Sequence, residues 1–363
     1  MILDSTLREG LQRYGLATDL EMRWRILDGL SRAGIPEAEI GVCGRDDSVE
    51  ILAERARRAR LPIKLSAWCP LREDSIDHAR RIRPDILSLS LPTSGDHLRK
   101  RLHLDESGAE DMLRKFSSMA RETGIRLSLG FEDASRTHGA FLQRLAALAQ
   151  ELGIFRLRAA DTVGILDARE VGGLVRRLRK ACRLEIGFHG HNDFGMATAN
   201  ALAALDAGAD CADASLLGLG ERAGIAATEE LGAFLHFRRR CGIDPGILAD
   251  LCRNLAREAH LPVVPWKPVV GDSLFHAESG MHVQGSLIDP KLYEPFDPAR
   301  IGAKRVVVLG RQTGKSAVRR KLASMGIAEP DDLDGLVRRI RETSENLGRP
   351  IEDRELAGIA TGG

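Results

Sequence analysis

Short apolar runs alternate with longer amphipathic stretches through the first two-thirds of the chain. The runs are rich in β-branched and large apolar residues. They predict eight β-strands, far enough apart for a helix to follow each one. The predicted strands are Met1–Ser5, Glu37–Val42, Ile63–Trp68, Asp85–Leu91, Ile125–Phe131, Ile154–Ala160, Leu184–His189 and Asp210–Leu216.

The stretches between these runs have the spacing of amphipathic helices. Leu20, Trp24 and Leu27 recur every three or four residues between the first two strands. Thr18 and Glu21 have the spacing of a capping box at the start of that helix. Eight strand–helix units are typical of a TIM (β/α)8 barrel, which is the fold that we predict. A doubly wound parallel sheet is the alternative, although that fold rarely contains eight regularly spaced strands.

The pattern changes beyond about residue 235, where helix-like segments dominate. These segments are Pro245–His260, Ser316–Met325 and Pro330–Leu347, and Leu261–Gly271 is rich in Pro and Val. We therefore expect a barrel catalytic domain over residues 1–235, a linker over 236–272 and a mainly helical carboxyl-terminal subdomain over 273–363.

Composition narrows the class of protein. The 363 residues include 53 Lys and Arg against 52 Asp and Glu, and this net charge of +1 argues against broad nucleic-acid binding. The longest apolar runs are far shorter than the roughly 20 residues of a membrane helix, so no membrane partner is expected. The first ten residues do not resemble a signal peptide. The six cysteines are scattered, which predicts a cytoplasmic protein without a disulfide framework.

Polar residues gather where the predicted strands end, and the active site of a TIM barrel lies at the carboxyl ends of its strands. The residues are Arg8 and Glu9 after the first strand, Glu132 and Arg136 after the fifth, Asp161 and Thr162 after the sixth, His189 and His191 at the seventh, and Glu221 and Arg222 after the eighth.

Two histidines near the end of the seventh predicted strand indicate a metal site. His189 and His191 are alternate residues, so both imidazoles can face the barrel mouth. The first and seventh strands both flank the eighth in a closed barrel, so Glu9 can reach the same ion. Two imidazoles and a carboxylate suit Zn²⁺, Mn²⁺, Co²⁺ or Fe²⁺. The alternative is that both histidines are structural residues that form hydrogen bonds within loops.

Five segments resemble the DRE-TIM metallolyases and, more narrowly, the 2-isopropylmalate, citramalate and homocitrate synthases. They are DSTLREGLQ (4–12), GFHGHNDFGMATANALAALDAGA (187–209), GLGERAGIAATEEL (218–231), FHAESGMHVQGSLIDPKLYEPFDPARIG (275–302) and VLGRQTGKSAV (308–318). They occur in the family's order and span most of the chain.

The resemblance implies a Claisen condensation, in which an acyl-CoA, usually acetyl-CoA, attacks the ketone of a 2-oxo acid before the thioester is hydrolysed. It also implies a divalent ion (Mn, Mg, Zn or Co) that binds the 2-oxo acid and acts as a Lewis acid. Arg8 would stabilise negative charge on the reacting oxygen. By this resemblance the metal ligands are Glu9, His189 and His191, the 2-oxo acid pocket contains Gln12, His97, Arg136 and Thr162, and Glu132 is catalytic.

The resemblance extends to the carboxyl-terminal part of the chain. It implies that His282 acts as the base, oriented by Glu278 and helped by Tyr293. In the family this segment crosses to a partner subunit, so we expect a homodimer with shared active sites.

Three positions depart from the family's usual pattern. Leu11 replaces a Glu, and Ile225 stands where isopropylmalate and citramalate synthases usually carry a metal-contacting Asn. Ser128 stands where the homocitrate synthases of lysine synthesis place an Arg, whereas residues 131–136 resemble the nitrogenase-type enzymes. Some homocitrate synthases of lysine synthesis share the Ile, so Ile225 and Glu9 favour homocitrate synthase, which joins acetyl-CoA to 2-oxoglutarate, whereas Ser128 counts against the lysine-pathway enzymes. We expect Arg136 and His97 to bind the distal carboxylate.

Other functions stay open at this point. The 2-oxo acid could be oxaloacetate, pyruvate or 2-oxoisovalerate. An aldolase-type lyase that needs no CoA is a different possibility, although such lyases generally lack the His282 segment. A noncatalytic metal-binding barrel is a third, and the complete set of site residues argues against it.

Overall fold

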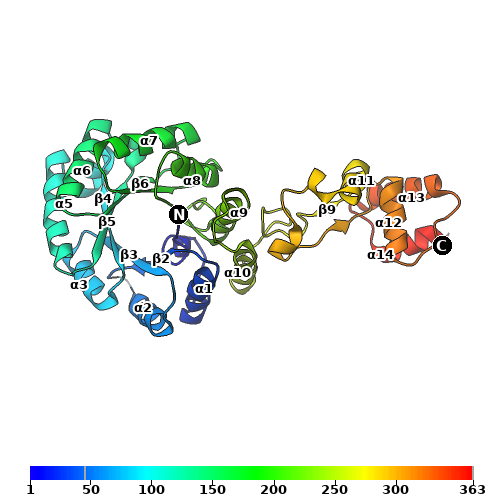
Figure 1. The fold of residues 1–363 in the computed structure, drawn as a ribbon, viewed down its shortest axis with the longest axis horizontal. Coiled ribbons are helices and arrows are strands. Elements are labelled where there is room, and N and C mark those ends of the chain that lie inside the picture. Colours follow the sequence, from blue (N-terminus) through cyan, green and yellow to red (C-terminus); the bar gives the residue numbers. More distant parts are fainter. Residues whose placement is uncertain (45, 362–363) are drawn as a thin grey trace. The chain divides into compact units, whose positions relative to one another are not determined.

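The computed structural model describes residues 1–44 and 46–361. It divides into two compact units, Met1–Pro262 and a second that begins at Val263. The first unit is a closed barrel of eight parallel strands in chain order, and β1 pairs with β8 to close it. Helices surround the barrel (Figure 1). This arrangement confirms the predicted TIM (β/α)8 barrel.

The strands begin and end close to the predicted positions. They are β1 Ile2–Asp4, β2 Glu37–Val42, β3 Lys64–Pro70, β4 Ile86–Pro92, β5 Arg126–Glu132, β6 Arg156–Asp161, β7 Glu185–Gly190 and β8 Cys211–Ala214. The α-helices of this unit are α1 Leu20–Arg32, α2 Ser48–Ala59, α3 Glu73–Ile82, α4 Gly95–His97, α5 Glu106–Arg121, α6 Gly139–Glu151, α7 Ala168–Ala181, α8 Ala197–Asp206, α9 Thr228–Arg239 and α10 Pro245–Glu258. Short 3₁₀ turns follow β1, β5 and β8, and a π-helical turn, Leu98–Leu102, follows α4.

The start of α1 differs from the predicted capping box. The carboxylate of Asp19, rather than the Thr18 hydroxyl, accepts the backbone N–H of Met22 at 2.7 Å. Thr18 accepts a hydrogen bond from the guanidinium of Arg23 instead. The Thr18–Glu21 prediction was therefore wrong by one residue, because a neighbouring carboxylate is an equally good cap.

Charged pairs fill part of the barrel interior, where branched apolar side chains usually predominate. Arg156 on β6 donates to both carboxylate oxygens of Glu37 on β2, at 2.9 and 2.8 Å. One layer nearer the carboxyl ends, Arg158 donates to Glu39 at 2.9 Å. All four side chains are buried. Buried charges need such partners because an unpaired charge inside a protein is costly.

The first compact unit continues to Pro262, beyond the expected domain end at residue 235. Its last helix, α10, packs on α1, where Leu251 lies against Gly29. The guanidinium of Arg25 on α1 forms an ion pair with Glu258 at 2.5 Å. The segment predicted as part of a linker thus contains a helix that belongs to the barrel unit.

The second unit is mainly helical, as predicted. It contains β9 His276–Ala277 and β10 Val306–Val307, which pair in parallel, and the helices α11 Gly280–Ile288, α12 Lys315–Ser324, α13 Leu333–Leu347 and α14 Asp353–Thr361. Its own core includes Val283, Leu309, Val318, Leu322, Leu336 and Ile340.

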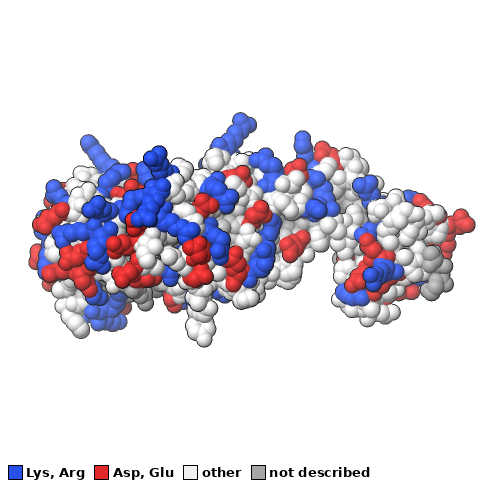
Figure 2. Space-filling view, turned by 90° about the horizontal axis from the view of Figure 1, so that it is seen from below, with Lys and Arg blue, Asp and Glu red and all other residues white. Residues whose placement is uncertain are grey.

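The surface carries both signs of charge. On the face displayed in Figure 2, acidic and basic side chains are interspersed over the barrel unit. Among the described residues, no helix is long and apolar enough to cross a membrane.

Candidate metal centre and active site

The barrel brings together the three residues predicted to bind a metal. Glu9 follows β1, His189 lies on β7 and His191 comes directly after β7. Each offers one possible ligand atom, and these atoms all lie within 4.8 Å of one another. All three residues are buried. Because β8 pairs with both β1 and β7, barrel closure places Glu9 beside the histidines.

The hydrogen bonds of the histidines suit a cation. His189 Nδ1 lies 2.8 Å from Asp213 Oδ2 on β8, so Nδ1–H donates to the carboxylate and Nε2 keeps its lone pair. Nε2 of His189 faces Nε2 of His191 at 3.4 Å. Two nitrogens about 2.1 Å from one tetrahedral ion lie about 3.4 Å apart. The donor set therefore fits a divalent cation shared by the two imidazoles.

The protonation states of the cluster also suit metal binding. Burial and the neighbouring His189 lower the pKa of His191 to about 4, so this imidazole is neutral near pH 7. Burial opposes ionisation of Glu9, but Arg8 and the two histidines bring the pKa of its carboxyl below the usual value. A neutral imidazole and an ionised carboxylate are the forms that bind metals.

A buried chain of charges holds Arg8 at the barrel mouth. Arg8 forms ion pairs with Glu9 and, at 2.5 Å through Nε, with Glu39. Arg158 lies between Glu39 and Asp213: its guanidinium donates to Glu39 and lies 3.4 Å from the carboxylate of Asp213. Burial alone would raise the pKa of Glu39, but the positive charges of Arg158 and Arg8 lower that pKa to about 2. The guanidinium of Arg8 is thus fixed in place as well as charged.

Three members of this chain of charges were not predicted from the sequence: Glu39, Arg158 and Asp213. A signal was present, since each places a charge within a predicted barrel strand, two residues after another charge in the case of Glu39 and Arg158. A buried strand tolerates such a residue only when a partner lies across the barrel.

A cavity of about 260 Å³ opens beside the cluster. Its lining includes most of the predicted site residues, namely Arg8, Glu9, Gln12, Glu132, Thr162, His189 and His191. Trp68, Ser90, Arg101, Gly130, Arg158, Ala160, Glu221 and Arg222 complete it. The Thr162 hydroxyl accepts the backbone N–H of Asp133 at 2.8 Å, which ties the loops after β5 and β6 together.

Two predicted pocket residues do not line this cavity. Arg136 is bound by the buried carboxylate of Asp133 through contacts of 2.7 to 3.0 Å. His97 has its Nδ1 atom 3.3 Å from the carboxylate of Glu132, which does line the cavity. Arg101, by contrast, lines the cavity and forms an ion pair with Glu132. Arg101 was missed, although it follows His97 by four residues, the spacing that puts two side chains on one helix face.

Ile225 cannot act as a metal ligand. It is buried and pairs through its backbone with His191 in an isolated antiparallel bridge. Its side chain offers no nitrogen or oxygen, so at this position the chain contributes backbone support to His191.

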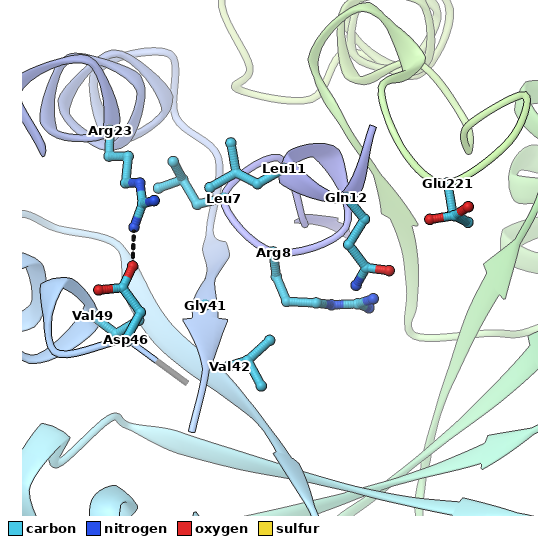
Figure 3. A pocket seen from close by; sticks show the side chains of 10 residues that line it. All are labelled: Leu7, Arg8, Leu11, Gln12, Arg23, Gly41, Val42, Asp46, Val49 and Glu221. Atoms are coloured by element: carbon cyan, nitrogen blue, oxygen red, sulfur yellow. Dashed lines mark hydrogen bonds and ion pairs between the residues drawn. The ribbon is translucent and has the colours of Figure 1, made fainter. Parts of the chain in front are cut away.

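A second cavity, of about 570 Å³, shares Arg8, Gln12 and Glu221 with the first. Figure 3 shows Arg8 and Gln12 between the Arg23–Asp46 ion pair and Glu221. Apolar side chains form much of its wall: Leu7, Leu11, Val42 and Val49. Leu11, the residue that departs from the usual motif, thus faces a space that adjoins the candidate metal centre.

The three carboxyl-terminal candidates belong to the second unit. The rings of His282 and Tyr293 lie with their centroids 4.5 Å apart and line a cavity of about 360 Å³. Glu278 accepts the backbone N–H of Gln312 at 2.7 Å. Within the described part of the chain, no hydrogen bond joins Glu278 to His282. The joint action of these residues with the barrel site stays a prediction.

Two family profiles match the chain. The HMGL-like profile covers residues 1–256, and the profile "Homocitrate synthase post-HMGL domain-like" covers residues 269–347. Together they extend over both compact units.

Similar proteins carry several names. The chain is 35% identical to 2-isopropylmalate synthase 2 of Caldanaerobacter subterraneus, over 98% of this chain and 93% of that protein. It is also 35% identical to homocitrate synthase 1 of Nostoc, over 99% and 96%. A 2-phosphonomethylmalate synthase of Streptomyces rubellomurinus is 33% identical, over 98% and 96%. Among solved structures, the HMG-CoA lyase of Bacillus subtilis covers 74% of this chain and 96% of its own, with a TM-score of 0.64. At 20% identity, that likeness speaks for the fold alone.

Proposed function

The chain belongs to the HMGL-like family, within its group of homocitrate and 2-isopropylmalate synthases, and we propose that it condenses an acyl-CoA with a 2-oxo acid. The observation that carries this proposal is the buried Glu9–His189–His191 cluster, which shares one cavity with Arg8 and Glu132. A divalent cation held there would polarise the ketone as a Lewis acid.

The residues of the barrel suit the remaining steps. The guanidinium of Arg8, fixed by Glu39, can donate to the ketone oxygen as negative charge develops on it. Gln12 and Thr162 line the cavity and offer hydrogen bonds to the 2-oxo acid. Glu132 provides a carboxyl group for proton transfer at the same cavity.

We propose His282 as the base that removes a proton from the acyl carbon next to the thioester. That carbon then attacks the ketone carbon, the alkoxide takes up a proton, and water hydrolyses the thioester to release CoA. Tyr293, whose ring lies against His282, and Glu278 are proposed to assist it. The resemblance supports a homodimer in which this segment serves the partner's barrel.

The proposed pair of substrates is acetyl-CoA and 2-oxoglutarate, which gives homocitrate. The homocitrate synthases among the relatives support this product. Oxaloacetate, pyruvate and 2-oxoisovalerate are the alternatives, because a 2-isopropylmalate synthase is equally similar. All six cysteines are free, which supports the cytoplasmic location that we propose.

Release of CoA thiol from acetyl-CoA, measured with each 2-oxo acid in turn, tests the proposal. We expect release that depends on a 2-oxo acid, and a product whose mass equals the sum of the 2-oxo acid and acetic acid. A protein that cleaves a 2-hydroxy acid without consuming acetyl-CoA would instead be a lyase.

A further inference from the structure

The larger of the two cavities at the barrel mouth has no part in the condensation described so far. Its volume is about 570 Å³, and it shares Arg8, Gln12 and Glu221 with the metal cavity. This volume lies within the range of small-molecule sites, roughly 300 to 1,000 Å³. Because the two cavities adjoin, a ligand that reacts at the metal centre can extend into the larger one.

The wall of the larger cavity is mainly apolar. Leu7 and Leu11 follow β1, Val42 is the last residue of β2, and Val49 lies in the first turn of α2 (Figure 3). Leu11 and Val42 are only partly buried. Val49 reaches the wall because Gly41 has no side chain: a Cβ atom built on Gly41 would lie 2.5 Å from Cγ2 of Val49. Apolar surface of this kind gains free energy when a ligand removes it from water.

The charges around this cavity do not favour an anionic ligand group. Among the described residues that line it, the cations are Arg8 and Arg23. Both are paired within the protein, since Arg8 donates to Glu39 at 2.5 Å and Arg23 donates to Asp46 at 2.7 Å. The lining also includes the side chain of Glu221. An anionic group would therefore meet two carboxylates and no unpaired guanidinium, whereas an aliphatic group needs no charged partner.

The proposed condensation leaves one part of a substrate to be placed here. The reacting carbon of acetyl-CoA is a methyl group, which is far smaller than this cavity. A longer straight acyl group still carries two protons on the carbon next to the thioester. One of them can leave to the base before that carbon bonds to the ketone carbon, the alkoxide takes up a proton and water releases CoA. The remaining carbons then need an apolar space beside the metal cavity.

We propose that Leu7, Leu11, Val42 and Val49 form a subsite for the alkyl chain of the acyl-CoA, so that the protein accepts straight acyl groups longer than acetyl. This inference rests on the proposed function, because the condensation places the acyl carbon at the metal cavity. Leu11 is the specificity-determining residue, since it is partly exposed and lines the cavity beside Gln12.

Binding measured apart from turnover tests the subsite. We would titrate the Mn²⁺-saturated full-length protein with acetyl-CoA, propionyl-CoA and butyryl-CoA by calorimetry, without a 2-oxo acid. The CoA part is the same in all three ligands, so differences in Kd report on the acyl group. Each methylene transferred from water to the apolar wall should lower the Kd by about 4-fold, and butyryl-CoA should bind about 10-fold more tightly than acetyl-CoA.

Two substitutions of Leu11 change the wall in different ways. Leu11→Glu puts a charge into it, and Leu11→Phe fills part of the space. Each should lower the ratio of the acetyl-CoA Kd to the butyryl-CoA Kd from about 10 to below about 3. Leu61→Glu is the matched control, because Leu61 is also partly buried but precedes β3 and so lies at the opposite end of the barrel. It should keep the wild-type ratio, and thermal unfolding checks that all three variants fold.

Turnover separates this proposal from the condensation itself. With a 2-oxo acid present, propionyl-CoA should release CoA and give a product whose mass equals the sum of the 2-oxo acid and propanoic acid. The subsite is refuted if butyryl-CoA binds no more tightly than acetyl-CoA, if both Leu11 variants keep the wild-type ratio, or if acetyl-CoA reacts and propionyl-CoA does not. If the chain-length order and the variant pattern appear but no acyl-CoA releases CoA with any 2-oxo acid, the subsite stands and the proposed condensation fails.

Discussion

The substitution Asp213→Asn isolates the contribution of one buried carboxylate to the candidate metal centre. Asp213 accepts the Nδ1 proton of His189 at 2.8 Å, which fixes the tautomer and increases the basicity of Nε2. The amide has the same shape but no charge. Losing such a partner typically weakens metal binding by about 10- to 100-fold, which corresponds to about 1.4 to 2.8 kcal/mol. Arg158 keeps its second partner, Glu39, so we expect the variant to fold.

The assay is a titration of metal-free protein with Co²⁺, followed by visible absorption, with thermal unfolding as the check on folding. Asp206→Asn is the matched control, because Asp206 forms an ion pair with Arg239 that is about half exposed to solvent. We expect a higher Kd for Asp213→Asn and an unchanged Kd for Asp206→Asn. An Asp213→Asn protein that binds Co²⁺ as tightly as the wild type would refute the role of Asp213 in orienting His189.

Three further predictions concern the buried charges, the cavity lining and the sharing of the site between subunits. Folding lowers the pKa of Glu39 from 4.5 to about 2, so the ionised carboxylate stabilises the fold by about 3 kcal/mol above pH 4.5, and this contribution is lost as the pH falls toward 2. In urea unfolding, the free energy of unfolding of Glu39→Gln should therefore be well below that of the wild type at pH 7, and the difference should shrink below pH 4.5. Arg101→Ala should lower kcat/KM by about 10-fold or more through the lost ion pair with Glu132, and Lys100→Ala, which removes only a surface pair with Asp96, should not. Mixed His282→Ala and Arg8→Ala subunits should regain partial CoA release if the site is shared, and a fully active monomer would contradict that sharing.

The barrel could be predicted because most of its strands are short and largely apolar runs. The metal-binding histidines could be predicted because His189 and His191 are alternate residues at the end of a strand and so face the same side. Once a closed barrel is predicted, the position of Glu9 beside His189 follows, because the first and seventh strands both flank the eighth. The end of the first unit was harder to predict, because α10 packs on α1, a contact between segments that are more than 200 residues apart. Sequence periodicity carries no signal for such a contact.

The direction in which individual side chains point could not be predicted from the sequence either. Arg136 and Arg101 are both basic residues near the barrel mouth, and the sequence favoured Arg136. In the structure Asp133 adopts a left-handed backbone, with φ of 61°, and its buried carboxylate binds Arg136. Arg101 reaches the cavity from a π-helical turn. Neither local conformation has a sequence pattern that identifies it before the fold is known.

The central claim is that a metal bound by Glu9, His189 and His191 is required for condensation. Metal content and CoA release measured on the same samples test it most directly, with wild type and His189→Ala compared before and after chelation. We predict one divalent ion per wild-type chain, loss of CoA release on chelation, recovery when Mn²⁺, Mg²⁺, Zn²⁺ or Co²⁺ is restored, and little metal or activity in His189→Ala. Full CoA release by a metal-free His189→Ala protein would contradict the claim.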